Sequence, residues 1–260
     1  KPEAAAPVKA AKAAKPARGK APPEAVKAEL PATLSPELAT LVDAPPSTPE
    51  DWIFEIKFDG YRLLARVEGK QVKLFTRNGN DWTHKLGKLE KGIAAMKLPD
   101  GWYDGEIVVH DENGKPNFGM LQLAFDGSNT AEIVYFIFDA PYCNGYDMRG
   151  VPLEARRAML QAVLEKSPSD MVRFSAEFGN DPQELVVAAC KMGLEGVIGK
   201  RRDSRYVERR SPEWIKLKCG QRQEFVIGGY TDPQGSRTGI GSLLLGVYDK
   251  NGVLQYAGNV

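Results

Sequence analysis

The stretch EIKFDGYR, Glu55 to Arg62, places a lysine between two carboxylates. Lys57 follows Glu55 by two residues and precedes Asp59 by two. A lysine amine is a nucleophile only when it is neutral, and at the ordinary pKa of about 10.4 only about one molecule in 2,500 is neutral at pH 7. This spacing therefore predicts covalent chemistry only if the surroundings of Lys57 favour the neutral amine.

Other cations in the sequence could provide those surroundings. Lys200 ends the run EGVIGK, while Lys216 and Lys218 alternate in WIKLKC and so point to one side of a strand. If these faces line the pocket that holds Lys57, the cations would disfavour its ammonium form and offset the negative charge of a polyphosphate. Taken singly, WIKLKC also fits an amphipathic edge strand and EGVIGK a buried strand. Likewise, Phe138 in FIFDA fits a core position, and Glu106 in YDGEIVVH a carboxylate that follows a turn.

Alternation predicts a strand around the lysine. Four apolar residues should point to a core and the other four to a polar pocket, namely Trp52, Phe54, Ile56 and Phe58 on one face, and Ile53, Glu55, Lys57 and Asp59 on the other. An antiparallel hairpin should follow, from RLLARV through a turn at 68–70 to QVKLFTRNG. Further strands are expected at 106–110 and 133–140, and helices at 84–97, 153–166 and 182–193, the last ending at Gly193. Hairpin-linked strands interspersed with helices predict an α+β fold.

The ends of the chain differ from this central part. Residues 1–30 hold seven Lys or Arg against three Asp or Glu and no aromatic residue, which predicts a disordered Ala/Lys/Pro linker. A mitochondrial-type presequence is the alternative, but five prolines in this segment would break any long helix. After Cys219, three short strand patterns without a helix predict the beginning of a small β-barrel. We therefore expect a main domain over 31–219 and a partial barrel over 220–260.

Composition narrows the class of protein. A chain of 260 residues with net charge +1 fits one large domain and part of a second, and its first residue, which is not Met, and its strand-like end suggest a piece of a longer protein. The cysteines Cys143, Cys190 and Cys219 are widely spaced without a CxxC motif, so we expect structural thiols in a reduced, cytoplasmic setting. His84 and His110 lack metal-ligand spacing, and neither zinc chemistry nor a histidine base is expected.

Six segments occur in a characteristic order over residues 52–218: EIKFDGYR, TRNG, YDGEIVV, FIFDAP, EGVIGK and WIKLKC. In this order the sequence resembles the covalent nucleotidyltransferases, which comprise polynucleotide ligases and mRNA capping enzymes. More closely, PYCNGYDMRGVPLEARR and EFVIGGYTDPQGSRTGIGSLLLGVYD resemble the ATP-dependent ligase module of the bacterial ligase D family. The resemblance implies an ATP-grasp-like nucleotidyltransferase domain with antiparallel sheets and flanking helices, followed by the start of an OB-fold barrel.

The resemblance also implies a role for each motif residue. Lys57 would attack the α-phosphate of ATP, become lysyl-AMP and expel pyrophosphate, with Asp59 orienting its loop. Glu55 would accept a hydrogen bond from the adenine amino group, and Phe138 would stack on the purine. The remaining site residues would contact the ribose, the phosphates or a divalent cation such as Mg2+ or Mn2+: Arg62 and Arg77 at ribose and phosphates, Glu106 at ribose or metal, Glu195 at the metal, and Lys200, Lys216 and Lys218 at the transferring phosphorus.

In the family, AMP then passes to the 5′-phosphate of a DNA break, and the 3′-hydroxyl seals the break and releases AMP. The implied partners are nicked or broken duplex DNA, other domains of a longer chain and an end-bridging protein, in the bacterial cytoplasm at the nucleoid and without a membrane. A basic run is a candidate DNA-facing strip or, alternatively, a solvated loop: Lys200, Arg201, Arg202, Arg205, Arg209 and Arg210. In GSRTGIGS we expect a hairpin bend that brings Arg237 near DNA.

The sequence departs from the family at one point, and two other functions stay open. No segment before Val260 matches the late basic motif that orients pyrophosphate, so we expect the chain to self-adenylate slowly and to seal pre-adenylated nicks better. One alternative is an RNA ligase or a GTP-using capping-type nucleotidyltransferase. The other is a nucleic-acid-binding scaffold without catalysis, which the full set of nucleotide-site residues disfavours.

Overall fold

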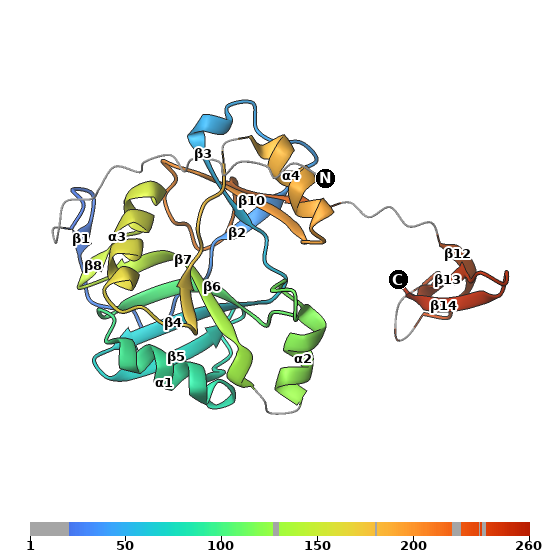
Figure 1. Cartoon of the computed structure of the whole chain (residues 1–260), viewed down its shortest axis with the longest axis horizontal. Coiled ribbons are helices and arrows are strands. Elements are labelled where there is room, and N and C mark those ends of the chain that lie inside the picture. The colour runs from blue at the N-terminus through green and yellow to red at the C-terminus, as the bar shows by residue number, and fades with distance from the viewer. Residues whose placement is uncertain (1–20, 127–129, 180, 220–224, 234, 236–237) are drawn as a thin grey trace, which may run out of the picture. The chain divides into compact units, whose positions relative to one another are not determined.

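A computed structural model describes residues 21–126, 130–179, 181–219, 225–233, 235 and 238–260. Contacts between residues divide the chain into two compact units, Lys1–Cys219 and Gly220–Val260. The first unit contains two β-sheets and four α-helices in its described residues, and the second contains one β-sheet (Figure 1).

The larger sheet of the first unit has seven strands. Its order is β1 (Val26–Lys27), β8 (Tyr146–Asp147), β7 (Val134–Cys143), β6 (Gly101–Val108), β4 (Tyr61–Glu68) and β5 (Gln71–Thr76), with β9 (Val172–Phe174) paired to β7 off this path. Every pairing is antiparallel except β7 with β9. The predicted hairpin is confirmed, because β4 pairs with β5 from Leu63↔Thr76 to Glu68↔Gln71, and Gly69 takes the positive φ of 58° in its turn.

The smaller sheet carries the lysine segment. Its order is β2 (Leu38–Leu41), β11 (Arg210–Lys218), β10 (Gly196–Arg201) and β3 (Trp52–Ile56). β10 lies between β11 and β3 and is antiparallel to both, with Ile198 paired to Glu55 and to Lys216. The EIK, EGVIGK and WIKLKC segments are thus neighbouring strands of one sheet.

Helices cover these sheets. They are α1 (Gly87–Met96), α2 (Phe118–Asp126), α3 (Leu153–Glu165) and α4 (Pro182–Lys191), with 3-10 turns at Pro49–Asp51, Thr83–Lys85 and Thr130–Glu132. The three predicted helices are confirmed as α1, α3 and α4, whereas α2 was not predicted. Asp181 caps α4 by accepting from two backbone N–H groups, and Gly193 follows its end at φ 73° as expected.

The main core lies between the seven-stranded sheet and its helices. Buried side chains of α1, α2 and α3 pack with those of β4 to β7 in one apolar cluster, for example Leu89, Leu121, Leu160, Leu63 and Ile137. Figure 1 shows α4 beside the smaller sheet, against which its buried Ala189 packs. The α+β class with antiparallel sheets is confirmed.

Two local predictions are wrong. Residues 21–30 are not part of a linker, because Val26–Lys27 pair with β8 and Leu30 packs against Trp102; residues 1–20 lie outside the described part. On the face of the 52–59 segment that was predicted to line a polar pocket, Ile53 departs from the prediction, because it is buried and packs with Phe138.

The second unit is a three-stranded antiparallel sheet of β12 (Val226–Thr231), β13 (Ser242–Tyr248) and β14 (Leu254–Asn259). The three strands match the three patterns in the sequence, and the OB-fold assignment stays a prediction. Arg237, which was expected in a hairpin bend near DNA, lies outside the described residues. None of the helices that the structure describes combines the length and apolar character needed to cross a membrane.

Candidate active site

A cavity of about 470 Å3 opens between the two sheets of the first unit, with walls from strands of both. Eight of the ten predicted site residues line it: Glu55, Lys57, Arg62, Arg77, Glu106, Phe138, Lys200 and Lys216. The other two, Glu195 and Lys218, form ion pairs next to Lys57. The structure thus brings together residues that lie up to 163 positions apart in the sequence.

Lys57 lies one residue beyond the end of β3, not within the strand. Its backbone N–H still donates to the carbonyl of Gly196 at 3.0 Å, so the neighbouring strand β10 holds the segment in place. The ammonium of Lys57 pairs with one oxygen of Glu195, and the ammonium of Lys218 lies 3.3 Å from the other. We call Lys57, Glu195 and Lys218 the Lys57 cluster.

The surroundings of Lys57 therefore include the carboxylate of Glu195, whereas only cations were predicted to act on its amine. Of the predicted cations, Lys216 and Lys218 lie near Lys57, whereas Lys200 pairs with Glu55. Burial and the neighbouring ammonium groups of Lys218 and Lys57 lower the pKa of Lys216. In this arrangement Lys57 must give up its ion pair with Glu195 before the amine can act as a nucleophile.

Glu55 lies deeper, with 2% of its surface exposed. Its Oε1 accepts from Arg157 Nη1 at 2.6 Å and from Lys200 Nζ at 2.8 Å, and its Oε2 accepts from Ser175 Oγ at 2.7 Å. We call Glu55, Arg157, Ser175 and Lys200 the Glu55 cluster. Protein groups thus already engage the carboxylate that was predicted to accept from the base.

Neither Arg157 nor Ser175 was predicted as a site residue, although Arg157 ends the segment PYCNGYDMRGVPLEARR. One signal was available for Arg157, because Leu153, Arg157, Leu160 and Leu164 share one face of α3 and are all buried. A charged residue in the middle of an apolar helical stripe predicts a buried ionic partner. Ser175, which directly follows β9, has no comparable signal in the sequence.

Lys200 differs most from its expected place. Its ammonium lies 3.9 Å from the centre of the Phe138 ring and 4.3 Å from that of Trp214, beside Glu55 rather than with Lys216 and Lys218. Burial lowers its pKa to about 8, against the opposing effect of Glu55. Its inclusion in an exposed DNA-facing strip is wrong, because only 2% of its surface is exposed.

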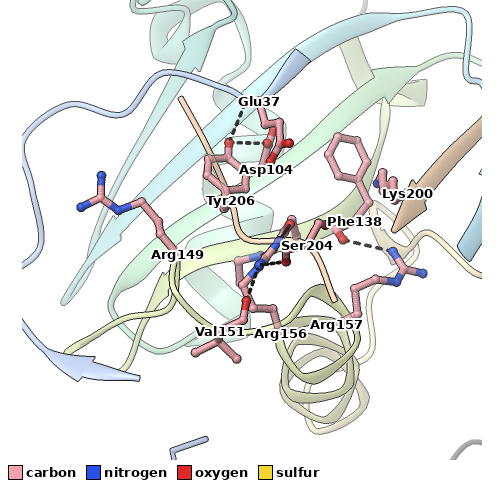
Figure 2. A network of polar contacts seen from close by, with 12 residues as sticks. Glu37, Asp104, Phe138, Arg149, Val151, Arg156, Arg157, Lys200, Ser204 and Tyr206 are labelled. Atoms are coloured by element: carbon pink, nitrogen blue, oxygen red, sulfur yellow. Dashed lines mark hydrogen bonds and ion pairs between the residues drawn. The ribbon is translucent and has the colours of Figure 1, made fainter. Parts of the chain in front are cut away.

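Arg62 is fixed by a buried network. Its Nε and Nη2 each donate to Asp104 at 2.6 Å, and its guanidinium lies 4.5 Å from the Phe138 ring centre. Asp104 also accepts from the hydroxyl of Tyr206 at 2.7 Å, and Tyr206 contacts the backbone N–H of Glu37 at 3.3 Å (Figure 2). These partners orient Arg62 over the ring of Phe138.

The remaining predicted residues lie around the cavity. Arg77 is exposed at the end of β5. Burial raises the pKa of Glu106 to about 7, although Arg62 and Lys57 oppose the shift. Burial and the Glu195 carboxylate also raise the pKa of Asp59.

The two predicted metal ligands fit a magnesium ion only in part. In the residues that the structure describes, no group of three or more His, Cys, Asp or Glu side chains could hold a metal ion. Magnesium usually takes one or two protein carboxylates and completes its coordination with water and substrate phosphates. Glu106 on the cavity wall and Glu195 beside Lys57 are compatible with that pattern.

The prediction of free structural thiols is wrong for two cysteines. Cys190 and Cys219 form a disulfide, with their Cα atoms 5.2 Å apart, whereas Cys143 is free and buried. The register of β10 and β11 places Cys219 next to the start of β10. Gly196 pairs with Lys218, and beyond this pair the N–H of Cys219 donates to the carbonyl of Glu195 at 3.0 Å. The end of α4 therefore meets the end of β11 beside the Lys57 cluster.

Comparison with known proteins identifies related chains. A family model described as ATP dependent DNA ligase domain matches residues 36–218. The multifunctional non-homologous end joining protein LigD of Pseudomonas aeruginosa is 53% identical over 236 residues, which is 90% of this chain and 28% of that protein. The corresponding DNA repair protein LigD of Mycobacterium tuberculosis is 34% identical over 229 residues, 87% of this chain and 29% of that protein.

Solved structures agree with these matches. A mycobacterial DNA ligase D complexed with ATP and MES has a TM-score of 0.66 and 34% identity, covering 87% of this chain and 72% of that one. The ligase domain of M. tuberculosis LigD has a TM-score of 0.65 and 33% identity over 87% and 72% of the two chains. The present chain spans less than a third of the length of the curated LigD proteins that it matches.

Proposed function

The chain belongs to the ATP-dependent DNA ligase family, and from this membership we propose that its first unit forms lysyl-AMP at Lys57 as the first step of DNA ligation. One observation carries the proposal. A single cavity joins an amine for covalent attachment, an aromatic ring, a carboxylate acceptor and several cations, as a nucleoside triphosphate requires.

In the first step, the cavity would hold ATP with its base at Glu55 and Phe138 and its phosphates toward the lysines. The neutral Nζ of Lys57 attacks the α-phosphorus and forms a P–N bond. The P–O bond to the β-phosphate breaks, pyrophosphate leaves with the electron pair, and the amine releases its proton. Lys216 and Lys218 would stabilise the charge that develops on the transferring phosphoryl group.

Arg62 and Arg77 would bridge ribose and phosphate oxygens, for which a planar guanidinium is well suited. The network of Asp104 and Tyr206 would keep Arg62 in place. A divalent cation, Mg2+ or Mn2+, would be held by Glu106 and Glu195 and would supply charge neutralisation to the phosphates.

The later steps would transfer AMP to the 5′-phosphate of a DNA break and seal it with the 3′-hydroxyl. Exposed arginines after β10, among them Arg205 and Arg209, would contact phosphates without reading sequence, so binding should weaken with salt. The names of the LigD relatives support a role in bacterial double-strand break repair. The further parts of the proposal, which are other domains and an end-bridging protein as partners and a cytoplasmic location, rest on the family resemblance.

Mass spectrometry of the protein incubated with ATP and magnesium tests the proposal. Wild type should gain one AMP on Lys57, Lys57→Ala should gain none, and Lys73→Ala, which removes an exposed lysine of β5, should behave as wild type. Incubation with GTP should give no adduct. An adduct at another residue, a GMP adduct, or no adduct in wild type would overturn the proposal, the second outcome in favour of a capping-type enzyme.

A pre-adenylated DNA nick separates ligase from scaffold. Wild type should seal it without ATP, and a variant lacking Lys216 and Lys218 should seal it far more slowly. If this variant sealed as well as wild type, or if wild type bound the nick without sealing it, the ligase assignment would fail.

A further inference from the structure

We propose that Arg157 and Ser175 are positioning residues that aim the one remaining acceptor site of Glu55 at the base, so that together they set the preference for a purine with an exocyclic amino group. The inference rests on the proposed function, because it concerns the nucleotide that the same cavity binds. Ser175 lies outside every segment that carried the resemblance, and Arg157, the last residue of PYCNGYDMRGVPLEARR, was given no role there.

Arg157 joins three segments that build this part of the cavity. Its Nη1 donates to Glu55 Oε1 at 2.6 Å and to the carbonyl of Phe138 at 3.1 Å, and its Nη2 donates to the carbonyl of Ser175 at 2.8 Å. Its guanidinium also lies 4.7 Å from the ring centre of Phe174. One rigid side chain thus sets the spacing between the expected base acceptor and the expected stacking ring.

The hydrogen bonds of Glu55 leave one acceptor site. A carboxylate has about four acceptor sites on its two oxygens. Arg157 and Lys200 occupy Oε1, and Ser175 occupies one site of Oε2, so the remaining site is on Oε2. Because Glu55 lines the cavity, that site is the one a ligand can reach.

The nature of this site selects the base. An acceptor pairs with the exocyclic amino group of adenine, but it meets another acceptor, a carbonyl oxygen, at the same position of hypoxanthine or guanine. A site built for a hydrogen bond strongly disfavours a ligand that leaves a buried polar group unpaired. If Arg157 or Ser175 were lost, the carboxylate could rotate and this discrimination would weaken.

The neighbouring arginine shows what a purely structural role looks like. Arg156 is fully buried and donates to Asp139 and to backbone carbonyls of Val151 and Ser204, none of which lines the cavity. Figure 2 shows the two side chains leaving α3 toward different partners, Arg157 toward Phe138 and Arg156 toward Ser204 and Val151. Arg156 is therefore a matched control for the loss of a buried guanidinium.

The test measures how fast each nucleotide forms its covalent nucleotidyl adduct on Lys57. It compares ATP with purine riboside triphosphate, which lacks the amino group. In Arg157→Lys and Ser175→Ala, we expect the KM for ATP to rise about tenfold or more, which corresponds to the loss of one good hydrogen bond between Glu55 and the base. The KM for purine riboside triphosphate should change less than about twofold. The preference for ATP over inosine triphosphate should fall in the same proportion, with kcat less affected. In Arg156→Lys, any loss should be equal for all three nucleotides.

Each outcome decides the question. Equal losses with ATP and purine riboside triphosphate in both Arg157→Lys and Ser175→Ala would mean that these residues only support the fold, and the inference would be overturned. Thermal unfolding checks each variant, and if Arg157→Lys does not fold, Ser175→Ala, which removes a single hydroxyl, decides alone. A wild-type protein that forms no adduct would refute the proposed function instead.

Discussion

Glu55 and Lys57 lie only two residues apart in the sequence, but the clusters of side chains around them are built in different ways. Glu55 accepts three hydrogen bonds from side chains and is 2% exposed, whereas the side chain of Lys57 is 16% exposed and that of its partner Glu195 28%. The first cluster is fixed by donors from α3, β10 and the segment after β9. The second is held by part-exposed ion pairs that water and substrate phosphates can replace.

This difference separates recognition from chemistry. Buried hydrogen bonds hold an acceptor in one orientation before a ligand arrives, which favours selection of a base. An amine that must exchange an ion pair for an attack on phosphorus benefits from partners that are easily displaced. The short segment from Glu55 to Lys57 thus contributes to a rigid cluster through Glu55 and to an adaptable cluster through Lys57.

The largest effect should appear when the same isosteric change is made in each cluster. Glu55→Gln leaves Arg157 and Lys200 buried without their carboxylate, and breaking such a buried pair costs about 3–5 kcal/mol. Glu195→Gln should change the free energy of unfolding by less than about 1 kcal/mol, since its pairs are partly exposed. Urea unfolding of the two variants measures both values, and equal destabilisation would remove the contrast.

Activity should respond in the second cluster. Glu195→Gln removes a proposed metal ligand. The magnesium concentration needed for half-maximal lysyl-AMP formation should therefore rise about tenfold, with the fold unchanged. Titration of magnesium at saturating ATP measures the shift. Lys73→Ala is the surface control, and an unaltered magnesium requirement in Glu195→Gln would place the cation elsewhere.

The sequence predicted the Lys57 cluster better than the Glu55 cluster. Lys57, Glu195 and Lys218 all belong to motifs, and neighbouring strands bring them together although Glu195 lies 138 residues from Lys57. Arg157 and Ser175 lie 102 and 120 residues from Glu55 and meet it only because α3 and the segment after β9 pack at a particular depth. Periodicity shows which face of an element is buried, but not which distant polar group that face meets.

The same limit explains the other errors. Cys190 and Cys219 have no sequence signal for pairing, and they meet only because α4 packs on the smaller sheet and the β10–β11 register places Cys219 beside Glu195. Helix α2 was not predicted because FGMLQLAFD is a short, almost wholly apolar run, in which periodicity does not separate a helix from a strand. Residues 21–30 resemble the preceding Ala/Lys/Pro segment in composition. The β4–β5 hairpin and the ends of α4, with Asp181 before it and Gly193 after it, have local sequence signals, and both elements were predicted.

The smallest expected effect is the contribution of Glu37 to the pH dependence of stability. Glu37 can be compared with Glu55, because it is a buried carboxyl without the cations that surround Glu55. It is 0% exposed, its Oε2 accepts one backbone N–H from Val207, and its Oε1 has no hydrogen-bond partner among the described residues. Burial raises its pKa to about 7 from an ordinary 4.5. Between pH 4.5 and 7 the folded protein therefore binds a proton that the unfolded chain has lost, so this contribution to stability falls as pH rises through the window. Glu106, whose pKa is also raised to about 7, should add to the same slope.

Replacing Glu37 by Gln, which is neutral at every pH, should flatten this dependence. The variant should gain on the order of 1 kcal/mol relative to wild type between pH 5 and pH 8, measured as a difference of thermal unfolding midpoints in matched buffers. Glu208→Gln, which alters a part-exposed carboxylate paired with Arg149, is the control and should keep the wild-type slope. Parallel curves for wild type and Glu37→Gln would show that burial alone does not hold this carboxyl in its protonated form, and that the cations at Glu55 are not what distinguishes the two sites.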